Sequence, residues 1–262
     1  MRTKEMMPQE LSPKIKLFAS PESWIDGNAI TQLKTMSELE GIERVAAFPD
    51  LHPGKGGPVG CSALTKDVIY PSFIGNDAGC GIGLWQIDLQ RRKLKLDKWA
   101  NKLTDLDSPW EHDYKTYLAG YYNISIPRDA LGTIGGGNHF AELQYIERVE
   151  DEERFKHYNI DRESLFICVH SGSRGLGHEL IKDHAAKHGY GPTKIEDAQE
   201  YLDQHDALKV WASVNRTLIA NRFAISIRAD IKEAITNNCH NSVDRKTLIH
   251  RKGQRNAAAD LY

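Results

Sequence analysis

The sequence predicts an α+β fold, and three of its features support this class. Apolar runs of strand length recur along the chain, with RVAAF at 44–48 and LFICVH at 165–170 as examples. Segments whose apolar residues follow the period of a helix lie between these runs. The two kinds of segment do not alternate regularly, whereas a doubly wound parallel sheet requires that alternation. We therefore expect strands and helices in mixed order, and the length allows one large domain or two modest ones.

The first expected elements are a helix, a strand and a loop. Residues 29–39 should form the helix, because apolar side chains recur there at helical spacing and Gly41 provides a stop. RVAAF at 44–48 is a short strand that runs into Pro49. Residues 50–60, DLHPGKGGPVG, are too rich in glycine and proline for a regular element, so we expect a loop.

Glycine-rich loops then separate the central elements. The apolar runs at 63–70 and 82–89 are expected to be strands on either side of the sequence GNDAGCG. Residues 91–124 have a mixed composition that favours helix. The glycine loop LGTIGGGNHF at 131–140 leads into an apolar segment at 140–145.

The last part of the chain combines strands with a long helical segment. LFICVH at 165–170 is expected to be a buried strand that ends at the loop SGSRGLG. Residues 194–237 should be helical, with an interruption near 204–206. A last short strand is expected at 248–250, before RKGQ.

Composition and charge describe a globular protein that is not broadly basic. The chain has 262 residues, 40% of them hydrophobic, and a formal net charge of −2, so any contact with a nucleic acid must use a local patch. No run approaches the roughly 18 apolar residues that span a bilayer, and the N-terminus lacks the apolar core of a signal peptide. The four cysteines form no CxxC pair, which favours free thiols in a reducing compartment. We therefore expect a cytoplasmic protein.

Asp77 and Cys80 are the first candidates for chemistry. They lie three residues apart in GNDAGCG, where glycines allow the loop to turn both side chains toward one point. A thiolate and a carboxylate beside imidazoles suit a borderline divalent ion such as Mn²⁺, Zn²⁺, Co²⁺ or Fe²⁺. A lone cysteine is more often a small buried apolar residue, and that alternative stays open.

Three histidines stand at boundaries between apolar elements and glycine or asparagine loops. They are His139 after GGGN, His170 at the end of a strand, and His240 in NCHN. Imidazole is a common metal ligand, although a single histidine beside an apolar element is more often a core residue. The sequence thus predicts a transition-metal site that combines these histidines with Asp77 and Cys80. The remaining histidines in polar or helical stretches are expected on the surface: His112, His157, His178, His184, His188 and His205.

The glycine loops also expose backbone N–H groups that can bind phosphate oxygens. GTIGGGNH and SGSRG are the two candidates, with Arg174 as a bidentate partner, although such a loop is more often only a tight turn. Two further loops could form a local basic patch with Arg174, or could simply be solvated. Their polar residues are Asp50, His52 and Lys55 in DLHPGKG, and His250, Arg251 and Lys252 in HRKG.

Seven motifs together resemble the RtcB-type RNA ligases. Their order and their spread from residue 48 to residue 253 argue against a chance match. The motifs are FPDLHPGKGGPVG (48–60), IGNDAGCGIG (74–83), LGTIGGGNHFAEL (131–143), VHSGSRGLG (169–177), WASVNRTLIANR (211–222), NCHN (238–241) and HRKG (250–253). The forms PDLHPGKGGPVG and IYPSFIGNDAGCG are most similar to the bacterial subgroup that is coupled to a release-factor-like protein.

The resemblance implies an RtcB-like mixed fold that forms a single catalytic domain over residues 1–262, with its active site on glycine-rich loops at strand ends. It implies a GTP-dependent ligase with two Mn²⁺ ions, which joins RNA 2′,3′-cyclic phosphate or 3′-phosphate ends to 5′-hydroxyl ends in RNA repair or tRNA splicing. Cys80 is expected to bridge the ions, and Cys80, His139 and His170 are the expected catalytic residues. The positions that match the family's metal ligands are Asp77, Cys80, His139, His170 and His240. Those that match its nucleotide contacts are Asn138 and Glu142.

One part of the family's pattern has no counterpart after HRKG. The resemblance implies a further segment that carries the histidine accepting GMP and a nucleotide-contacting lysine, but no histidine follows His250. We therefore expect a chain truncated at its C-terminus, or one whose partner segment lies on another chain. Three functions stay open: the ligase, a metal-dependent cyclic phosphodiesterase or phosphoesterase that needs no GTP, and a non-catalytic remnant that binds RNA ends.

Overall fold

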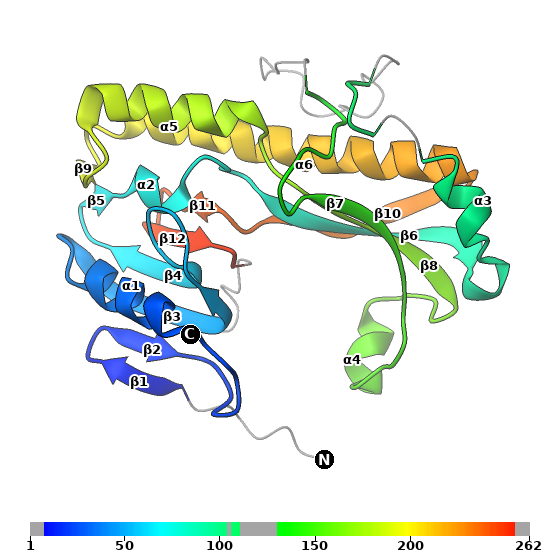
Figure 1. The fold of residues 1–262 in the computed structure, drawn as a ribbon, viewed down its shortest axis with the longest axis horizontal. Coiled ribbons are helices and arrows are strands. Elements are labelled where there is room, and N and C mark those ends of the chain that lie inside the picture. Colours follow the sequence, from blue (N-terminus) through cyan, green and yellow to red (C-terminus); the bar gives the residue numbers. More distant parts are fainter. Residues whose placement is uncertain (1–7, 104–105, 111–129, 255–262) are drawn as a thin grey trace. The chain divides into compact units, whose positions relative to one another are not determined.

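Helices and strands in mixed order form two compact units. The computed structural model describes residues 8–103, 106–110 and 130–254. Unit 1 comprises Met1–Gly79, Gly175–Lys209 and His240–Tyr262, and unit 2 comprises Cys80–Arg174 and Val210–Cys239. The sheets and helices of the described residues (Figure 1) confirm the predicted mixed α and β class. The single domain over residues 1–262 stays a prediction, since two compact units can belong to one domain.

Unit 1 contains a six-stranded sheet with the order β1-β2-β3-β4-β12-β11. The pair β2–β3 is parallel and the other pairs are antiparallel. Helix α1 (Gly27–Ser37) packs Leu33 and Met36 into the core of this sheet, and the Asp26 side chain caps its start by accepting a hydrogen bond from the Asn28 N–H at 2.8 Å. The strands are β1 (Gln9–Ser12), β2 (Ile15–Leu17), β3 (Ile42–His52), β4 (Val59–Thr65), β11 (Ser242–Val243) and β12 (Ile249–Lys252).

Unit 1 has a second apolar core, to which two helices contribute. Leu180 of α5 (Gly175–His188) and Leu202 of α6 (Gln199–Ile227) pack there with Ile69 and Ile74. These last two residues belong to β5 (Val68–Ile69), which pairs with β9 (Thr193–Lys194), and to α2 (Pro71–Ile74). The chain of α6 passes into unit 2 at Val210. None of the helices in the described ranges is both long and apolar enough to cross a membrane.

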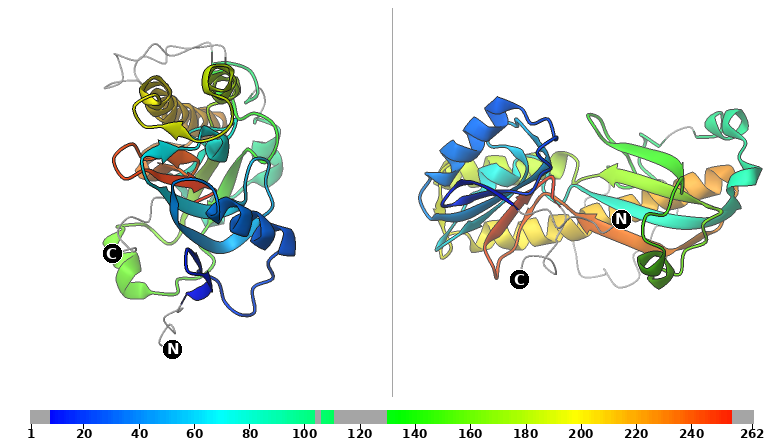
Figure 2. Two further views of the ribbon diagram at one scale, coloured as in Figure 1. Left: turned by 90° about the vertical axis from the view of Figure 1, so that its left-hand side faces the viewer. Right: turned by 90° about the horizontal axis from the view of Figure 1, so that it is seen from below.

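Unit 2 is built on a four-stranded antiparallel sheet with the order β10-β6-β8-β7. The unit 2 part of α6 covers one face of this sheet, where Ile219 and Phe223 pack with Trp85 and Ile167 (Figures 1 and 2). Because side chains alternate along a strand, His170 lies on the opposite face from Ile167. The strands are β6 (Gly81–Gln90), β7 (Phe140–Tyr145), β8 (Ser164–Ser171) and β10 (Ile231–Cys239), and the short helices are η1 (Arg91–Lys93), α3 (Leu96–Ala100) and α4 (Glu152–His157).

Several sequence predictions are confirmed, because strong apolar patterns mark elements locally. The expected helix over 29–39 corresponds to α1, and the strands expected near 44–48, 82–89, 165–170 and 248–250 correspond to β3, β6, β8 and β12. The apolar segment noted at 140–145 is strand β7. All four cysteines are free, as expected from their spacing.

The helical segment expected over 194–237 is wrong in two respects. Helix α6 runs without a break to Ile227, and residues 231–239 form strand β10. The polar residues at 204–206 do not interrupt the helix, because His205 is buried and its Nε2 accepts a hydrogen bond from the Val243 N–H at 3.2 Å. β10 is an edge strand of polar sequence, so its pairing with β6 is not visible in its side-chain pattern.

Other boundaries also differ from expectation. β3 extends to His52 and β4 starts at Val59, so the loop expected over 50–60 is shorter. Helix α5, which follows SGSRG, was not expected. Of the helix expected over 91–124, the described part contains the short elements η1 and α3, while residues 104–105 and 111–129 lie outside the described residues.

Three histidines of unit 1 are buried. The surface position predicted for His184 and His205 is wrong, and burial lowers the pKa of each ring. His250 lies between two main-chain groups: Nε2 accepts from the Tyr70 N–H at 2.9 Å, and Nδ1 lies 3.1 Å from the Leu248 carbonyl oxygen. Burial lowers the pKa of His250 to about 4, so the neutral ring is part of the fold. His157, His178 and His188 are exposed as predicted, and His112 lies outside the described residues.

Stability should fall as the pH decreases from 6.5 toward 4. A histidine that stays neutral in the folded state but is protonated in the unfolded state favours unfolding over this interval. For His250, the pKa shift from 6.5 to about 4 corresponds to about 3 kcal/mol. Urea unfolding at neutral and mildly acidic pH measures the effect. His250→Gln, which cannot titrate, should reduce the pH dependence, while His157→Gln at an exposed site should not. An unchanged pH dependence in His250→Gln would contradict this interpretation.

Candidate metal centre

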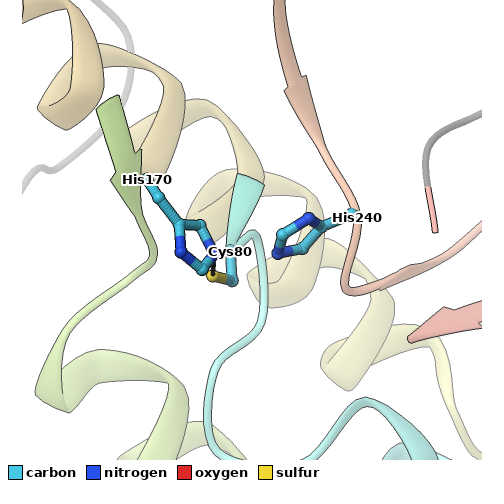
Figure 3. Close-up of side chains that lie close together, drawn as sticks. All are labelled: Cys80, His170 and His240. Atoms are coloured by element: carbon cyan, nitrogen blue, oxygen red, sulfur yellow. Dashed lines mark hydrogen bonds between the residues drawn. The ribbon is translucent and has the colours of Figure 1, made fainter. Parts of the chain in front are cut away.

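A cysteine and two histidines of unit 2 converge on one point. The Cys80 Sγ lies 3.1 Å from the His170 Nε2 and 3.5 Å from the His139 Nε2. The two imidazole rings are inclined at 83°, with centroids 5.3 Å apart. Cys80 and His170 are buried and His139 is half-buried. Figure 3 shows the Cys80 thiol against the His170 ring; His240, also labelled there, belongs to unit 1.

Strand register brings these three residues together. Cys80 directly precedes β6, His139 directly precedes β7, and His170 is the penultimate residue of β8. Phe140, the residue after His139, pairs with His170, while Gly81, the residue after Cys80, pairs with the residue that follows His170. Since β8 lies between β6 and β7, the starts of both neighbours meet the end of β8. A slip of one residue between β6 and β8 would turn Cys80 away from the face of His170. His139 lies one residue before β7, outside the alternation of that strand.

A hydrogen bond determines which nitrogen of His170 faces Cys80. The His170 Nδ1 lies 3.0 Å from the Asn138 carbonyl oxygen, and a carbonyl oxygen can only accept. Nδ1 therefore carries the proton, and Nε2 directs its lone pair toward the sulfur. Backbone carbonyls orient metal-binding histidines in the same way.

The distance from the Cys80 sulfur to each of the two ring nitrogens fits shared coordination of a transition metal. Bonds of about 2.3 Å to sulfur and about 2.0 Å to imidazole nitrogen place these ligand atoms about 3.5 Å apart in a tetrahedral site. The observed separations from the Cys80 sulfur are 3.1 and 3.5 Å. Cys80 with His170, and Cys80 with His139, belong to two different side-chain groups whose spacing can accommodate a metal ion. A thiol with two imidazoles is a donor set that borderline divalent ions accept, so this is a candidate metal centre.

The other two predicted ligands, Asp77 and His240, belong to unit 1 and are half-buried. The Asn241 side chain donates from Nδ2 to the Asp77 carbonyl oxygen at 3.3 Å. The Asn241 carbonyl oxygen in turn accepts from the Gly79 N–H at 2.9 Å. The residue next to His240 therefore orders the main chain of the loop that carries Asp77.

The two predicted nucleotide contacts are exposed residues of unit 2. Asn138 supplies the carbonyl that orients His170. Glu142 lies on β7 opposite Cys168, two residues from His170 along β8, so it shares the sheet face of that histidine. Burial, and then the charge of Glu142, raises the pKa of Cys168 to about 11. The Glu142 carboxylate accepts from the Gln144 Nε2 at 2.6 Å and remains accessible to a ligand above this face.

Arg174 connects the two glycine loops of unit 2. Its Nε donates to the Thr133 Oγ1 at 3.1 Å, and its guanidinium occupies the position where a side chain at Gly135 would begin. Gly135 has a φ of +95°, so both its conformation and the close approach of Arg174 require glycine. Arg174 thus lies between GTIGGGNH and SGSRG, the two loops from which the sequence predicted a phosphate site.

The predicted basic patch of unit 1 is only partly exposed. His250 and Arg251 are buried, so neither contributes to a surface patch. Lys252 donates from Nζ to the Lys55 carbonyl oxygen at 2.9 Å, and burial lowers the pKa of Lys252. The exposed residues of the neighbouring loop are Asp50, His52 and Lys55.

Sequence analysis did not single out one buried polar pair on α6. Asn215 and Arg216 are both 0% exposed. The signal was present in the motif WASVNRTLIANR, where an amide and a guanidinium interrupt a run of apolar and small residues. A buried charge is rare unless it is paired, so such an interruption in a helix of a globular protein indicates specific partners.

The thiol and imidazole donors at the ends of adjacent strands define a candidate metal-binding protein of the mixed α and β class. A model of the family described as "tRNA-splicing ligase RtcB" matches residues 32–116 and 121–261. The chain therefore belongs to the RtcB family.

Curated relatives agree with this assignment. The chain is 39% identical over 253 residues to "RNA-splicing ligase RtcB2" of Escherichia coli, and this match covers 93% of the chain and 66% of the Escherichia coli protein. It is 26% identical over 334 residues to "tRNA-splicing ligase RtcB" of Nanoarchaeum equitans, a match that covers 94% of the chain and 70% of that protein. It is 27% identical over 311 residues to the protein of that name from Thermococcus kodakarensis, a match that covers 86% of the chain and 64% of that protein. The chain is thus a homologue of RNA-splicing ligases that spans about two thirds of their length.

Gly81→Ala should destabilise the sheet next to Cys80. A Cβ at this position would lie 2.6 Å from the Cys239 Cα and against the Asn238 carbonyl, and these main-chain atoms of β10 cannot rotate away. Overpacking of this kind costs about 1–3 kcal/mol. Urea unfolding measures the loss. Gly136→Ala, whose new Cβ meets nothing within 4 Å, is the matched control. Equal stability of the two variants would contradict the register of β6 and β10.

Proposed function

We propose that the chain contributes the metal-binding part of a GTP- and Mn²⁺-dependent RNA ligase. The proposed reaction joins RNA 2′,3′-cyclic phosphate or 3′-phosphate ends to 5′-hydroxyl ends, in RNA repair or tRNA splicing. The observation that carries the proposal is the convergence of Cys80, His139 and His170 in a chain of the RtcB family. The names of its relatives, which are RNA-splicing and tRNA-splicing ligases, supply the class of reaction.

We assign five ligands to two Mn²⁺ ions: Asp77, Cys80, His139, His170 and His240. His240 is assigned because it stands in NCHN, which matches the family's ligand position, and directly follows β10. Sequence proximity supports Asp77, which lies three residues before Cys80 on a glycine loop. Cys80 is the proposed bridge, since a metal-bound thiol is deprotonated. Two bound ions would polarise the phosphoryl group and stabilise the attacking and leaving oxygens.

The chain's own residues would bind and orient the reactants. We assign guanine nucleotide contacts to Asn138 and Glu142, which are exposed beside the candidate centre. The Arg174 guanidinium and the N–H groups of the glycine loops are proposed to bind phosphate oxygens, because a planar guanidinium pairs with two oxygens at once. The Asn138 carbonyl keeps the proton of His170 on Nδ1, so that Nε2 stays available as a ligand. Cys80, His139 and His170 are the proposed catalytic residues, because they would hold the metal ions at the reacting phosphate.

The proposed macromolecular partners are RNA ends and a release-factor-like protein. The protein partner is supported by the motif forms PDLHPGKGGPVG and IYPSFIGNDAGCG, whose resemblance is to the subgroup coupled to such a factor. The net charge of −2 leaves RNA binding to local cationic groups. Lys55 is exposed and Arg174 is partly exposed, so these two residues are the candidates for contact with RNA.

Covalent guanylylation tests the ligase proposal. The purified chain is incubated with Mn²⁺ and α-labelled GTP, and label bound covalently to protein is measured. Joining of a 3′-phosphate RNA to a 5′-hydroxyl RNA is then assayed. No residue of this chain is assigned as the GMP acceptor, so we expect both signals only when a segment that supplies the acceptor histidine is added, and we expect both to be lost in Cys80→Ala. Protein that binds Mn²⁺ but takes up no label even with that segment present would contradict the ligase proposal. In that case, GTP-independent hydrolysis of a 2′,3′-cyclic phosphate would identify the phosphoesterase, and RNA-end binding without turnover the remnant.

Cys80→Ala and His170→Ala should each weaken metal binding. Removal of a direct ligand should cost at least the roughly 10–100-fold in affinity that is lost when a ligand's supporting partner is removed. Calorimetric titration with Mn²⁺ and metal analysis after gel filtration measure the change. His157→Ala, an exposed histidine of α4, is the control for the general effect of losing an imidazole. Wild-type metal stoichiometry and affinity in both Cys80→Ala and His170→Ala would remove the proposed site.

A further inference from the structure

A buried polar network on α6 contacts the segments that carry the proposed ligands. Asn215 and Arg216 are 0% exposed, and an apolar pair of similar size would cost far less to bury. The surrounding apolar packing is supplied separately by Ile219 and Phe223, which belong to the core cluster of unit 2. The stability of the helix therefore does not explain why two polar side chains occupy these positions.

Asn215 contacts the glycine loop that leads to His139. Its Oδ1 accepts from the Gly132 N–H at 2.6 Å, and its Nδ2 donates to the Thr133 carbonyl oxygen at 3.0 Å. Nδ2 also lies 3.2 Å from the Ser171 Oγ, which in turn donates to the Ile134 carbonyl at 2.8 Å. One amide thus satisfies main-chain groups of the loop and connects them to the residue that follows His170.

Arg216 contacts the ends of two strands. Its Nη1 donates to the Ser171 carbonyl oxygen at 2.8 Å, at the end of β8 directly after His170. Its Nε donates to the Asn237 Oδ1 at 2.7 Å, on β10 three residues before His240. Asn237 returns a hydrogen bond from Nδ2 to the Ser213 carbonyl at 2.9 Å, so the strand is also connected to α6. The rigid fork of a guanidinium can set two such distances at once, which a single ammonium cannot do.

The segment after His240 is bonded to the same helix within unit 1. The His205 Nε2 accepts from the Val243 N–H at 3.2 Å, three residues beyond His240. The chain on each side of His240 therefore has a hydrogen bond to a buried side chain of α6, through Asn237 before it and Val243 after it.

We propose that Asn215 and Arg216 are positioning residues for the metal ligands. Neither side chain is a ligand; together they set the main-chain positions of the glycine loop before His139, of Ser171 after His170 and of Asn237 before His240. This inference rests on the metal site proposed above. Polar partners that orient ligands in this way typically change metal affinity by about 10–100-fold when they are removed.

Cobalt titration of the full chain separates a positioning role from a purely structural one. Thiolate-bound Co²⁺ has a charge-transfer band in the near ultraviolet, which reports the geometry at Cys80 independently of any activity. We expect Arg216→Met and Asn215→Ala to bind Co²⁺ about 10–100-fold more weakly than wild type and to alter the band. Arg216→Lys, which keeps the charge but not the fork, should recover only part of the affinity.

The matched control is Ile219→Ala, which removes apolar packing from the same helix without touching the network. It should lower stability in urea while Co²⁺ affinity changes less than about threefold. If Arg216→Met does not fold, Asn237→Ala provides the second variant, because it removes one acceptor of Arg216 at a half-buried edge position.

The outcomes distinguish this inference from the proposed function. Wild-type protein without a thiolate band would contradict the metal site itself. The positioning role would be overturned if wild type shows the band and the network variants match Ile219→Ala in Co²⁺ affinity and spectrum. The network variants are Arg216→Met, Asn215→Ala and Asn237→Ala. The metal site itself would remain supported.

Discussion

The approach of one buried thiol to two imidazoles is the constraint on which the rest of unit 2 depends. Separations of 3.1 and 3.5 Å between the Cys80 sulfur and two ring nitrogens require adjacent strands to begin and end at the same level. The antiparallel pairing of β8 with both neighbours supplies this, and a slip of one residue between β6 and β8 would turn Cys80 to the other face. Gly81 extends the requirement to β10, because any side chain there would meet the main chain of that strand. The sheet therefore serves as the frame of the candidate centre.

Buried polar groups distinguish α6 from an ordinary covering helix. Ile219 and Phe223 suffice to pack it on the sheet, while Asn215 and Arg216 face main-chain groups of loops that would otherwise have fewer fixed contacts. Burying a guanidinium is unfavourable unless every donor has a partner. Specific geometry, rather than added stability, is the advantage that such a network offers.

Sequence reasoning identified local features and missed those that depend on distant partners. β6 and β8 were predicted because their apolar runs are local signals. Cys80, His139 and His170 were predicted because each stands where an apolar element meets a glycine loop. A helix was predicted over most of β10, because the strand conformation of these residues depends on their pairing with β6. The burial of His205 depends on Val243, and the importance of Arg216 depends on Ser171; neither partner is near in sequence.

The proposed metal centre depends on the Cys80 sulfur being a metal ligand beside histidine nitrogen. X-ray absorption at the metal edge of the Zn²⁺-loaded chain tests it most directly, because sulfur and nitrogen scatterers differ in distance and strength. We predict sulfur at about 2.3 Å with imidazole nitrogen at about 2.0 Å, and loss of the sulfur contribution in Cys80→Ser. A wild-type spectrum that contains only oxygen and nitrogen neighbours would contradict a metal centre built on Cys80.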